Sequence, residues 1–201
     1  MKIVILGTGS TAQSIASIIL SNRDFQVVGF TSNKREEGKL ILGVKVIGTH
    51  DILADLFRQG VRGAVAAVGY DNKIREKYFY ELKDIGFELI NVVHHSALID
   101  QSAEIGEGVV IGQGSIILPM VKIGRNTQLE AGVIVGANAQ IGDNVYIGIG
   151  CNISGASCIK RNAFLSPGSS IAPLVTVGKN AKVAPAASVT KNIPDRVRGE
   201  K

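Results

Sequence analysis

An aliphatic residue stands at every sixth position of this chain from Ile99 to Val189, without a slip in phase. The residue two places before each of these is small or β-branched, as at Ala97, Val121 and Ala163. A six-residue period of this length predicts a parallel β-helix, because one extended hexapeptide makes one flat side of a coil. A β-sandwich, whose strands alternate with a period of two, does not keep such a phase.

With three sides to a coil, residues eighteen apart should stack, and the aliphatic positions then form three inward ladders. The ladders are Ile99, Ile117, Val135, Ile153, Ile171, Val189, then Ile105, Ile123, Ile141, Ile159, Val177, and finally Ile111, Leu129, Ile147, Leu165, Val183. β-Branched residues dominate them, as stacked strands favour. We expect the chain to turn at the glycines that directly follow an aliphatic position, which are Gly106, Gly112, Gly124, Gly136, Gly142, Gly148 and Gly178.

The first ninety residues instead alternate short apolar strands with amphipathic helices. Residues 2–6 predict a buried strand, and Gly7-Thr8-Gly9-Ser10-Thr11-Ala12 predicts a glycine turn into a helix that reaches Leu20. We expect further strands at residues 25–30, 44–47, 63–68 and 88–93, and helices at residues 51–58 and 73–85. The second of these helices should be capped by Asp71 or Asn72 and closed by Gly86.

The sequence therefore predicts two domains, a small Rossmann-like α/β domain over residues 1–93 and a β-helix domain over residues 94–201. The helix N-terminus at the glycine turn should present free amides to an anion such as a phosphate. A domain that binds NAD should carry an acidic residue at the end of its second strand, where Thr31, Ser32, Asn33 and Lys34 stand here. We therefore expect no NAD.

Composition narrows the function classes. The chain has 201 residues and a formal charge of +5, and no apolar run approaches the ~18 residues of a membrane span. Without a secretory leader pattern, a cytoplasmic protein is expected. No aromatic residues are interleaved with basic ones, so nucleic acid is not an expected partner, and neither is a membrane. The basic cluster at the C-terminus (Lys191, Arg196, Arg198 and Lys201) is interpreted as a solvated tail or as a contact for a phosphate-bearing cofactor.

Few side chains are suited to catalysis. Cys151 and Cys158 fit as filler between the sides of a coil, and no metal site is expected. His50 is interpreted as a solvated residue at a helix start, and His94 and His95 as structural residues at the domain junction. Carboxylates at the coil corners, such as Glu130 and Asp143, are more often solvated than catalytic. The sequence thus leaves the catalytic residue unknown.

The order of the motifs along the chain resembles that of a known protein family. GTGST follows the first strand, V-x-V-I-G-T spans residues 44–49, G-x-D-N spans 69–72, and His-x-Ser-Ala at 94–97 leads into hexapeptides. Over its whole length the chain resembles the bacterial sialic acid O-acetyltransferase and UDP-4-amino-sugar N-acetyltransferase family. The resemblance implies a left-handed β-helix, a homotrimer, acetyl-CoA in the groove between neighbouring β-helices, and a nucleotide-linked sugar held partly by the N-terminal domain.

The chain departs from this family at its catalytic positions. The family's histidine in a segment like V-E-H-D-C falls at Gly155, and a second family histidine falls at Asn162. An amine that is already neutral can attack a thioester without a side-chain base, whereas an alcohol cannot. The departures therefore favour transfer to nitrogen or a loss of turnover over O-acetylation.

The resulting hypothesis is an acetyl-CoA-dependent transfer to the amino group of a nucleotide-linked amino sugar, in bacterial surface-glycan biosynthesis. The alternatives are a degenerate homologue that binds CoA or nucleotide sugar without turnover, and an O-acetyltransferase; an oxidoreductase is disfavoured. The expected substrate-binding residues are Gly7, Gly9, Ser10, Thr11, Asp71 and Asn72. The expected cofactor-binding residues are Gly150, Gly155, Ser166, Gly168, Ala184 and Lys191.

Overall fold

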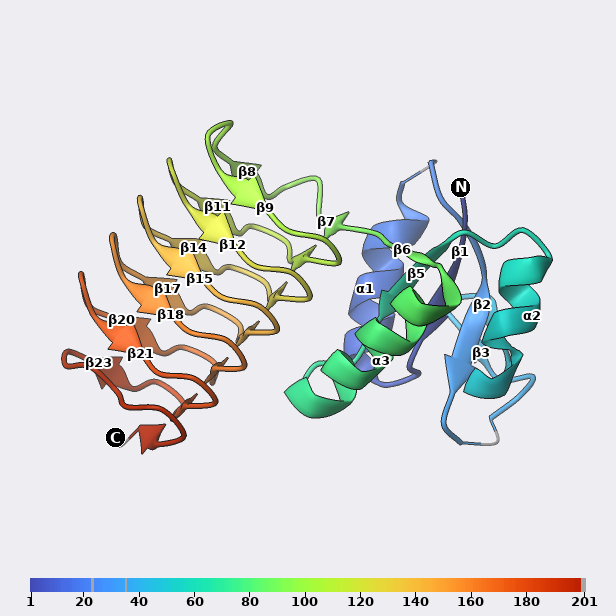
Figure 1. Ribbon diagram of the computed structural model, residues 1–201. Helices are drawn as coiled ribbons and strands as arrows, with labels where there is room; N and C mark the ends of the chain where they lie inside the picture. Colours follow the sequence, from blue (N-terminus) through green and yellow to red (C-terminus); the bar gives the residue numbers. More distant parts are fainter. Residues whose placement is uncertain (23, 35, 200–201) are drawn as a thin grey trace. The chain divides into compact units, whose positions relative to one another are not determined.

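The computed structural model describes residues 1–22, 24–34 and 36–199, and the chain divides into two compact units, Met1–Val92 and Val93–Lys201 (Figure 1). The first unit is a Rossmann-like α/β domain, and the second is a left-handed parallel β-helix of hexapeptide repeats. No helix of the described residues has the length and apolar character needed to cross a membrane.

The first unit is built around one six-stranded sheet in the order β3-β4-β2-β1-β5-β6. All described pairings in it are parallel except that of β3 with β4. The strands are β1 (Lys2–Leu6), β2 (Gln26–Ser32), β3 (Leu40–Ile41), β4 (Val44–Thr49), β5 (Gly63–Ala66) and β6 (Glu88–Leu89). The helices are α1 (Ser10–Leu20), the 3₁₀ turn η1 (His50–Ile52), α2 (Leu53–Arg58) and α3 (Asn72–Ile85).

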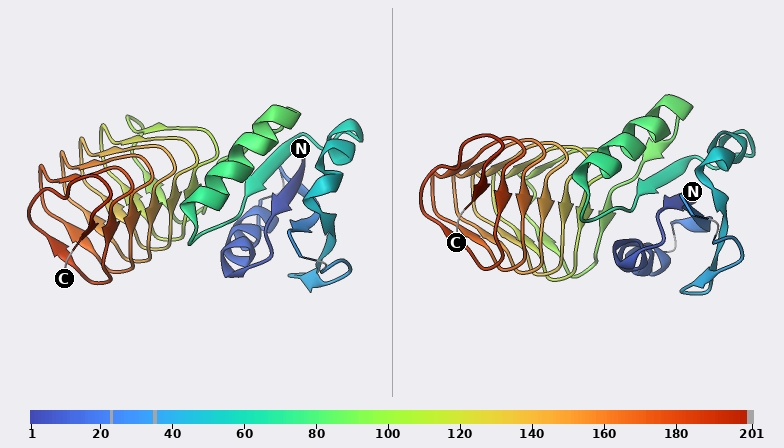
Figure 2. Two further views of the ribbon diagram at one scale, coloured as in Figure 1. Left: turned by 60° about the horizontal axis from the view of Figure 1, so that its bottom comes forward. Right: turned by 90° about the horizontal axis from the view of Figure 1, so that it is seen from below.

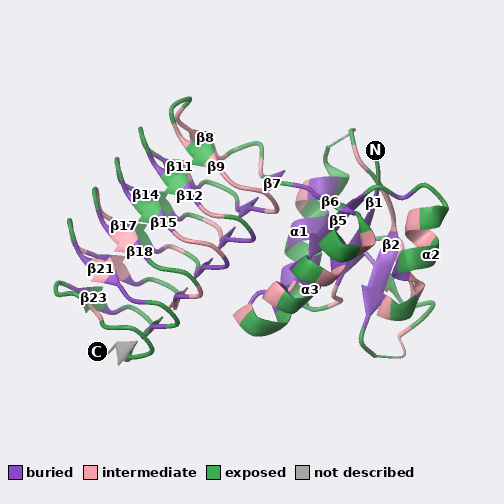
Figure 3. Cartoon of the chain, in the orientation of Figure 1, coloured by how far each residue is buried: buried purple, intermediate pink, exposed green. Residues whose placement is uncertain are grey.

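Helices cover both faces of this sheet, and Figure 2 shows α1 and α3 on opposite sides of it. Val4 and Leu6 of β1 pack with Phe79 and Leu82 of α3 in one apolar cluster. The intervening Ile3 and Ile5 are also fully buried, as a strand between two helical layers requires. Figure 3 shows β1 and β2 as the buried centre of the domain.

The turn between β1 and α1 is held tightly against β5. Gly7 has φ +117°, and a Cβ at this position would lie 2.7 Å from the carbonyl oxygen of Ala67. Gly9, the residue before α1, has φ −76° and open space where a Cβ would stand. Only the first of these two glycines is therefore required by the backbone.

The α/β elements follow the sequence expectation with three differences. Strand β3 was not predicted, because two residues are too few to show a period. The run expected as one strand at 88–93 is divided between β6 and β7 (Val92–Val93), which belong to different sheets. The helix expected at 51–58 begins as a 3₁₀ turn before it becomes α2.

The β-helix is made of two-residue strands in three parallel sheets, visible as stacked coils in Figure 1. The first sheet contains β8 (Leu98–Ile99), β11 (Ile116–Ile117), β14 (Ile134–Val135), β17 (Asn152–Ile153), β20 (Ser170–Ile171) and β23 (Ser188–Val189). The second contains β9 (Glu104–Ile105), β12 (Lys122–Ile123), β15 (Gln140–Ile141), β18 (Cys158–Ile159) and β21 (Thr176–Val177). The third contains β7, β10 (Val110–Ile111), β13 (Gln128–Leu129), β16 (Tyr146–Ile147), β19 (Phe164–Leu165), β22 (Lys182–Val183) and β24 (Arg198–Gly199).

Every described pairing between successive coils from β8 to β23 joins residues eighteen apart, such as Ile117 with Val135 and Ile123 with Ile141. The three predicted ladders are thereby confirmed, and their side chains form one apolar core. The third ladder also extends at both ends, where β7 and β24 join it.

The predicted positions of the turns were wrong. The left-handed residues recur every sixth place from Gly108 to Ala186, three positions after the aliphatic residue rather than directly after it. The glycines that directly follow the aliphatic residues are required for a different reason. A Cβ at Gly136, for example, would lie 2.4 Å from the backbone nitrogen of Gly155 in the next coil. These glycines are required by the close approach of stacked coils.

One column of left-handed residues is occupied by asparagines, a residue type that adopts this conformation readily. The amide Nδ2 of Asn126 donates to Oδ1 of Asn144 over 2.8 Å, and Asn144 donates to Asn162 over the same distance. Asn162 donates in turn to Asn180 over 3.3 Å. The asparagine ladder (Asn126, Asn144, Asn162, Asn180) therefore links four successive coils at one corner of the β-helix.

We expect Ile141→Asp to unfold the β-helix, because the carboxylate would stand unpaired in the apolar core and cost more than about 4 kcal/mol. Ile141 is 3% exposed, whereas its neighbour Gln140 in the same strand faces solvent. Thermal unfolding by circular dichroism, with light scattering for oligomeric state, measures the effect. Gln140→Asp is the matched control and should leave both unchanged; a folded Ile141→Asp protein would contradict the ladder.

Gly7→Ala should destabilise the N-terminal domain by about 2 kcal/mol or more, because alanine disfavours the left-handed backbone and its Cβ meets Ala67. Gly9→Ala should change the free energy of unfolding much less, since its backbone is extended and its surroundings are open. Urea unfolding of both variants compares the two positions. Equal stability of the two would show that the tight turn has been misjudged.

Candidate functional site

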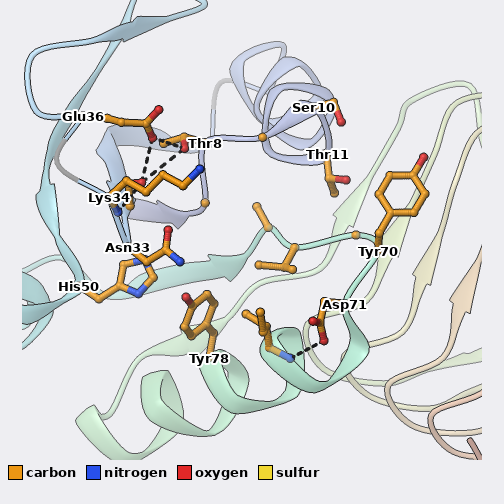
Figure 4. A pocket seen from close by; sticks show the side chains of 17 residues that line it. Thr8, Ser10, Thr11, Asn33, Lys34, Glu36, His50, Tyr70, Asp71 and Tyr78 are labelled. Carbon is orange, nitrogen blue, oxygen red and sulfur yellow. Dashed lines mark hydrogen bonds between the residues drawn. The ribbon is translucent and has the colours of Figure 1, made fainter.

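A cavity of about 500 Å³ lies in the N-terminal domain where the carboxyl ends of β1, β2 and β5 meet (Figure 4). Strand β1 stands at the point where the strand order reverses, which is where open α/β sheets bind their ligands. The lining residues are Gly7, Thr8, Gly9, Ser10, Thr11, Ser32, Asn33, Lys34, Glu36, His50, Ala67, Val68, Gly69, Tyr70, Asp71, Ile74 and Tyr78.

Five of the six residues expected to bind substrate line this cavity, namely Gly7, Gly9, Ser10, Thr11 and Asp71. Asn72 does not line it and forms the first residue of α3. The carboxylate of Asp71 caps α3, accepting hydrogen bonds from the backbone nitrogens of Lys73 and Ile74 over 3.0 and 3.1 Å. One oxygen of Asp71 is thus committed to the fold.

A buried arginine holds the loop after β5, which forms the cavity wall next to the glycine turn. Arg75 is 2% exposed, and its Nη1 donates to the carbonyls of Val68 and Gly69 over 3.1 and 3.0 Å. Gly69 also packs against Thr11, whose hydroxyl would lie 2.3 Å from a Cβ added at Gly69. The loop after β5 is therefore held in one conformation beside the start of α1.

Sequence reasoning missed a carboxylate at the end of the second strand. Oε2 of Glu36 accepts hydrogen bonds from the hydroxyls of Thr8 and Ser32 over 2.6 and 2.9 Å, and Oε1 accepts from Lys39 over 3.1 Å. The Thr8 hydrogen bond, followed by those from Lys39 and Ser32, lowers the pKa of Glu36 to about 2. Residues 31–34 carry no acidic side chain, yet a carboxylate still reaches this edge, because Glu36 folds back four residues after the strand.

The interpretation of His50 as a solvated residue was also wrong. Its Nε2 is buried and finds no hydrogen-bond partner among the described residues, although the side chain lines the cavity. The ring meets Tyr78 edge-on, with centroids 4.6 Å apart. Desolvation lowers the pKa of His50, so the imidazole is neutral near pH 7.

The residues expected to bind cofactor lie at two different corners of the β-helix. Gly150, Ser166, Gly168 and Ala184 lie on the corner that connects the third sheet to the first. There the column of left-handed positions is glycine in four successive coils and offers a strip without side chains. Gly155 and Lys191 lie on the next corner, between the first sheet and the second. A further cavity, of about 540 Å³, follows β12, β15 and β18, and none of these six residues lines it.

The two positions of the missing family histidines have different structural explanations. Gly155 is half-buried with an ordinary backbone, and a Cβ there would lie 3.1 Å from the carbonyl oxygen of Ala137. A side chain at position 155 would therefore need only a small shift of the neighbouring backbone. Asn162, by contrast, belongs to the asparagine ladder and has φ +61°.

The thiol and imidazole groups of the β-helix take part in hydrogen bonds within the fold. The thiol of Cys151 is buried and hydrogen-bonds to the Ser166 carbonyl over 3.2 Å, and burial raises its pKa. Nδ1 of His94 hydrogen-bonds to the hydroxyl of Ser96 over 2.8 Å. Among the described residues, no group of three or more His, Cys, Asp or Glu side chains is arranged to hold a metal ion.

Comparison with known protein families finds two matches. Residues 2–82 match the PglD N-terminal domain, and residues 120–155 match the bacterial transferase hexapeptide, a unit of six repeats. The change from an α/β domain to stacked coils lies between these two matched ranges. Together the two matches cover more than half of the chain.

Solved structures repeat this arrangement over nearly the whole chain. A histidine-to-asparagine mutant of perosamine N-acetyltransferase from Caulobacter crescentus, in complex with CoA and GDP-perosamine, is 28% identical with a TM-score of 0.92; the match covers 97% of this chain and 91% of that one. WeeI from Acinetobacter baumannii AYE shares the fold at 21% identity and a TM-score of 0.86, covering 97% and 94%. The acetyltransferase domain of PglB from Neisseria gonorrhoeae FA1090 shares it at 24% and 0.61, covering 97% and 93%. The chain thus joins a PglD N-terminal domain to bacterial transferase hexapeptide repeats, an architecture that it shares with hexapeptide-repeat sugar acyltransferases.

Proposed function

We propose that the protein transfers an acetyl group from acetyl-CoA to the amino group of a nucleotide-linked amino sugar, in bacterial surface-glycan biosynthesis. The observation that carries this proposal is the likeness over 97% of the chain to an N-acetyltransferase bound to CoA and GDP-perosamine. The cavity at the strand ends and the glycine strip of the β-helix supply the two binding surfaces that such a reaction needs.

The nucleotide sugar is assigned to the cavity of the N-terminal domain. The glycine turn places the first amides of α1 toward the cavity, and the first turn of this helix (residues 10–13) contains no acidic side chain. These amides favour an anion such as the diphosphate of an activated sugar. The fixed loop after β5, with Tyr70 and Asp71, supplies the adjoining wall beside the start of α1.

Acetyl-CoA is assigned to the β-helix, between two copies of the chain. The two corners that carry the expected cofactor residues are separated by one flat side of the coil, about 15 to 20 Å of extended chain. A neighbouring copy that presents its second corner to the first corner of this chain would bring both sets of residues to one groove. An apolar stripe on the first sheet, exposed at Leu98 and Ile134 and half-buried at Ile116, suits such a contact, and we propose a homotrimer.

The chemistry requires a neutral amine rather than a strong side-chain base. The amine nitrogen attacks the thioester carbonyl, a C–N bond forms and the C–S bond breaks. The proton that the nitrogen loses passes to the sulfur of CoA, which leaves as the thiol. His94 cannot assist at Gly155 of the same copy, because more than three coils of ~4.8 Å separate them along the axis. Orientation and backbone amides then supply the catalysis.

Gly155 also favours the main alternative, a homologue that binds its ligands without turnover. Calorimetric titration with acetyl-CoA, followed by a thiol-release assay against GDP- and UDP-linked 3-amino and 4-amino sugars, separates the two. Release with an amino sugar supports the proposed reaction, and binding without release supports the alternative. Efficient release with only a hydroxyl acceptor would instead indicate an O-acetyltransferase.

Gly155→His tests whether a base is missing. If the substrate amine is already neutral, this variant should change kcat/KM for the amino sugar by less than about tenfold, although a general base typically contributes 10²–10⁴-fold. The pH profile of the natural protein should likewise show no group that titrates with the pKa of an imidazole. An increase of 10²-fold or more in the variant would show that the natural chain lacks a base that it needs.

Ser166→Trp should weaken acetyl-CoA binding at least about tenfold, because the indole would cover the glycine strip between Gly150 and Gly168. Lys160→Trp is the matched control, since Lys160 occupies the same place after its aliphatic residue at the third corner. Calorimetry gives the affinity, and thermal unfolding verifies that both variants fold. Equal affinity of the two variants would remove acetyl-CoA from this corner.

A further inference from the structure

The hairpin of β3 and β4 exposes two leucines at the edge of the N-terminal domain. Strand β3 is the outermost strand of the sheet and pairs with β4 alone in the described part of the chain (Figure 1). Leu40 is 61% exposed and Leu42 is 56% exposed, whereas Ile41 between them is 5% exposed. The apolar tip (Leu40 and Leu42) therefore lies outside the core that Ile41 helps to form.

Backbone hydrogen bonds anchor this hairpin to the sheet. The backbone nitrogen of Val46 donates to the carbonyl of Lys39 over 2.8 Å, and that of Gly38 donates to the carbonyl of Val46 over 2.9 Å. Val46 is buried and pairs with Phe30 of β2. The exposure of the two leucines is thus a fixed feature of the fold.

A leucine is an unfavourable choice at the turn of this hairpin. Ile41 pairs with Val44, which leaves a turn of two residues. These residues, Leu42 and Gly43, have φ angles of +49° and +80°. Turns of this kind favour Asn-Gly or Asp-Gly, because a bulky side chain is disfavoured in the left-handed region. Since Leu42 is more than half exposed, packing within the domain offsets little of this cost, and the residue indicates a contact outside the domain.

Lysines lie beside the apolar tip. Lys45 is paired with Leu40 across the hairpin, so the two side chains lie next to each other on one face. Lys39 directly precedes Leu40, and its side chain is 52% exposed although it bonds to Glu36. The exposed end of the hairpin therefore combines apolar side chains with two ammonium groups.

Acidic residues balance only part of this positive charge. Between residues 34 and 45 the sequence has four basic residues and two acidic ones, Glu36 and Glu37. The carboxylate of Glu36 is turned toward the domain, where it accepts hydrogen bonds from Thr8 and Ser32. The segment therefore has an excess of positive charge, which attracts an anionic surface.

Two leucines flanked by lysines fit the surface of an anionic bilayer better than they fit another protein. A stable protein interface buries about 800 Å² on each partner, far more than the tip of a two-residue turn offers. At a bilayer, apolar side chains enter the boundary between headgroups and acyl chains while lysines stay with the phosphates, each lysine adding about fivefold in affinity. The expectation that a membrane is not a partner rested on the lack of a spanning segment, which a surface contact does not need.

We propose that the β3–β4 hairpin docks the protein on an anionic lipid surface, with Leu40 and Leu42 among the headgroups and Lys39 and Lys45 at the lipid phosphates. None of residues 39–45 lines the cavity at the strand ends. The contact therefore goes beyond the proposed function and does not depend on it.

Sedimentation of the full chain with lipid vesicles tests this contact. One set of vesicles contains phosphatidylcholine alone, and the other contains phosphatidylcholine mixed with phosphatidylglycerol. The protein should bind the mixed vesicles at least about tenfold more tightly, and this preference should fall as salt is added. Leu42→Asn should weaken binding to the mixed vesicles at least about tenfold, and Lys45→Gln about fivefold.

Two comparisons separate a loss of docking from a loss of fold. Asparagine suits a left-handed turn, so Leu42→Asn should unfold at the same temperature as the natural protein or at a higher one. Leu174→Asn is the matched control, because Leu174 is 77% exposed with φ +64° but lies in the β-helix. This control should bind vesicles as the natural protein does.

Three results of the binding experiment overturn the proposal: no binding to either set of vesicles, equal binding to both, or full binding by Leu42→Asn. The first of these would leave the hairpin to a protein partner. A marked loss of thermal stability in Leu42→Asn would show that Leu42 serves the fold, and an equal loss of binding in Leu174→Asn would show that the hairpin is not the docking surface. Either result also refutes the proposal.

Discussion

The backbone hydrogen bonds that pair strands eighteen residues apart are the constraint on which the C-terminal half of this protein depends. Two-residue strands are far too short to be stable by themselves, so each coil exists only because the next coil satisfies its backbone. This close stacking excludes a Cβ at positions such as Gly136 and demands a left-handed residue once per side. Composition, turn chemistry and the position of every outward side chain follow from it.

The N-terminal domain solves a different problem, which is to gather side chains from distant parts of the sequence at one edge. Parallel strands bring the turn at Gly7 and the ends of β2, β4 and β5 together because their carboxyl ends share that edge. Structural bonds keep the edge in shape: Asp71 caps α3, and Arg75 holds two carbonyls of the neighbouring loop. Residues that stabilise the shape of the cavity therefore lie next to residues that are free to face a ligand.

What the sequence reveals in these two halves differs for physical reasons. A repeat with an unbroken phase determines which residues stack, so the ladders of Ile117 and Ile141 were predictable residue by residue. The turn positions were not, since a glycine serves both for a left-handed backbone and for close approach. In the α/β domain the glycine turn was recognisable, but Glu36 and His50 were not, because loops that fold back and side chains that become buried leave no periodic signal.

The six-residue side and the eighteen-residue coil together restrict how a chain of this design changes in length. An insertion of eighteen residues within the repeats would add one whole coil and leave every later residue on its original face. An insertion of six would keep the backbone pattern but rotate all later residues to the next face, which would separate the glycine strip of Gly150 and Gly168 from its continuation. Length and surface chemistry are therefore coupled, and the β-helix can lengthen without scrambling its faces only in steps of a full coil.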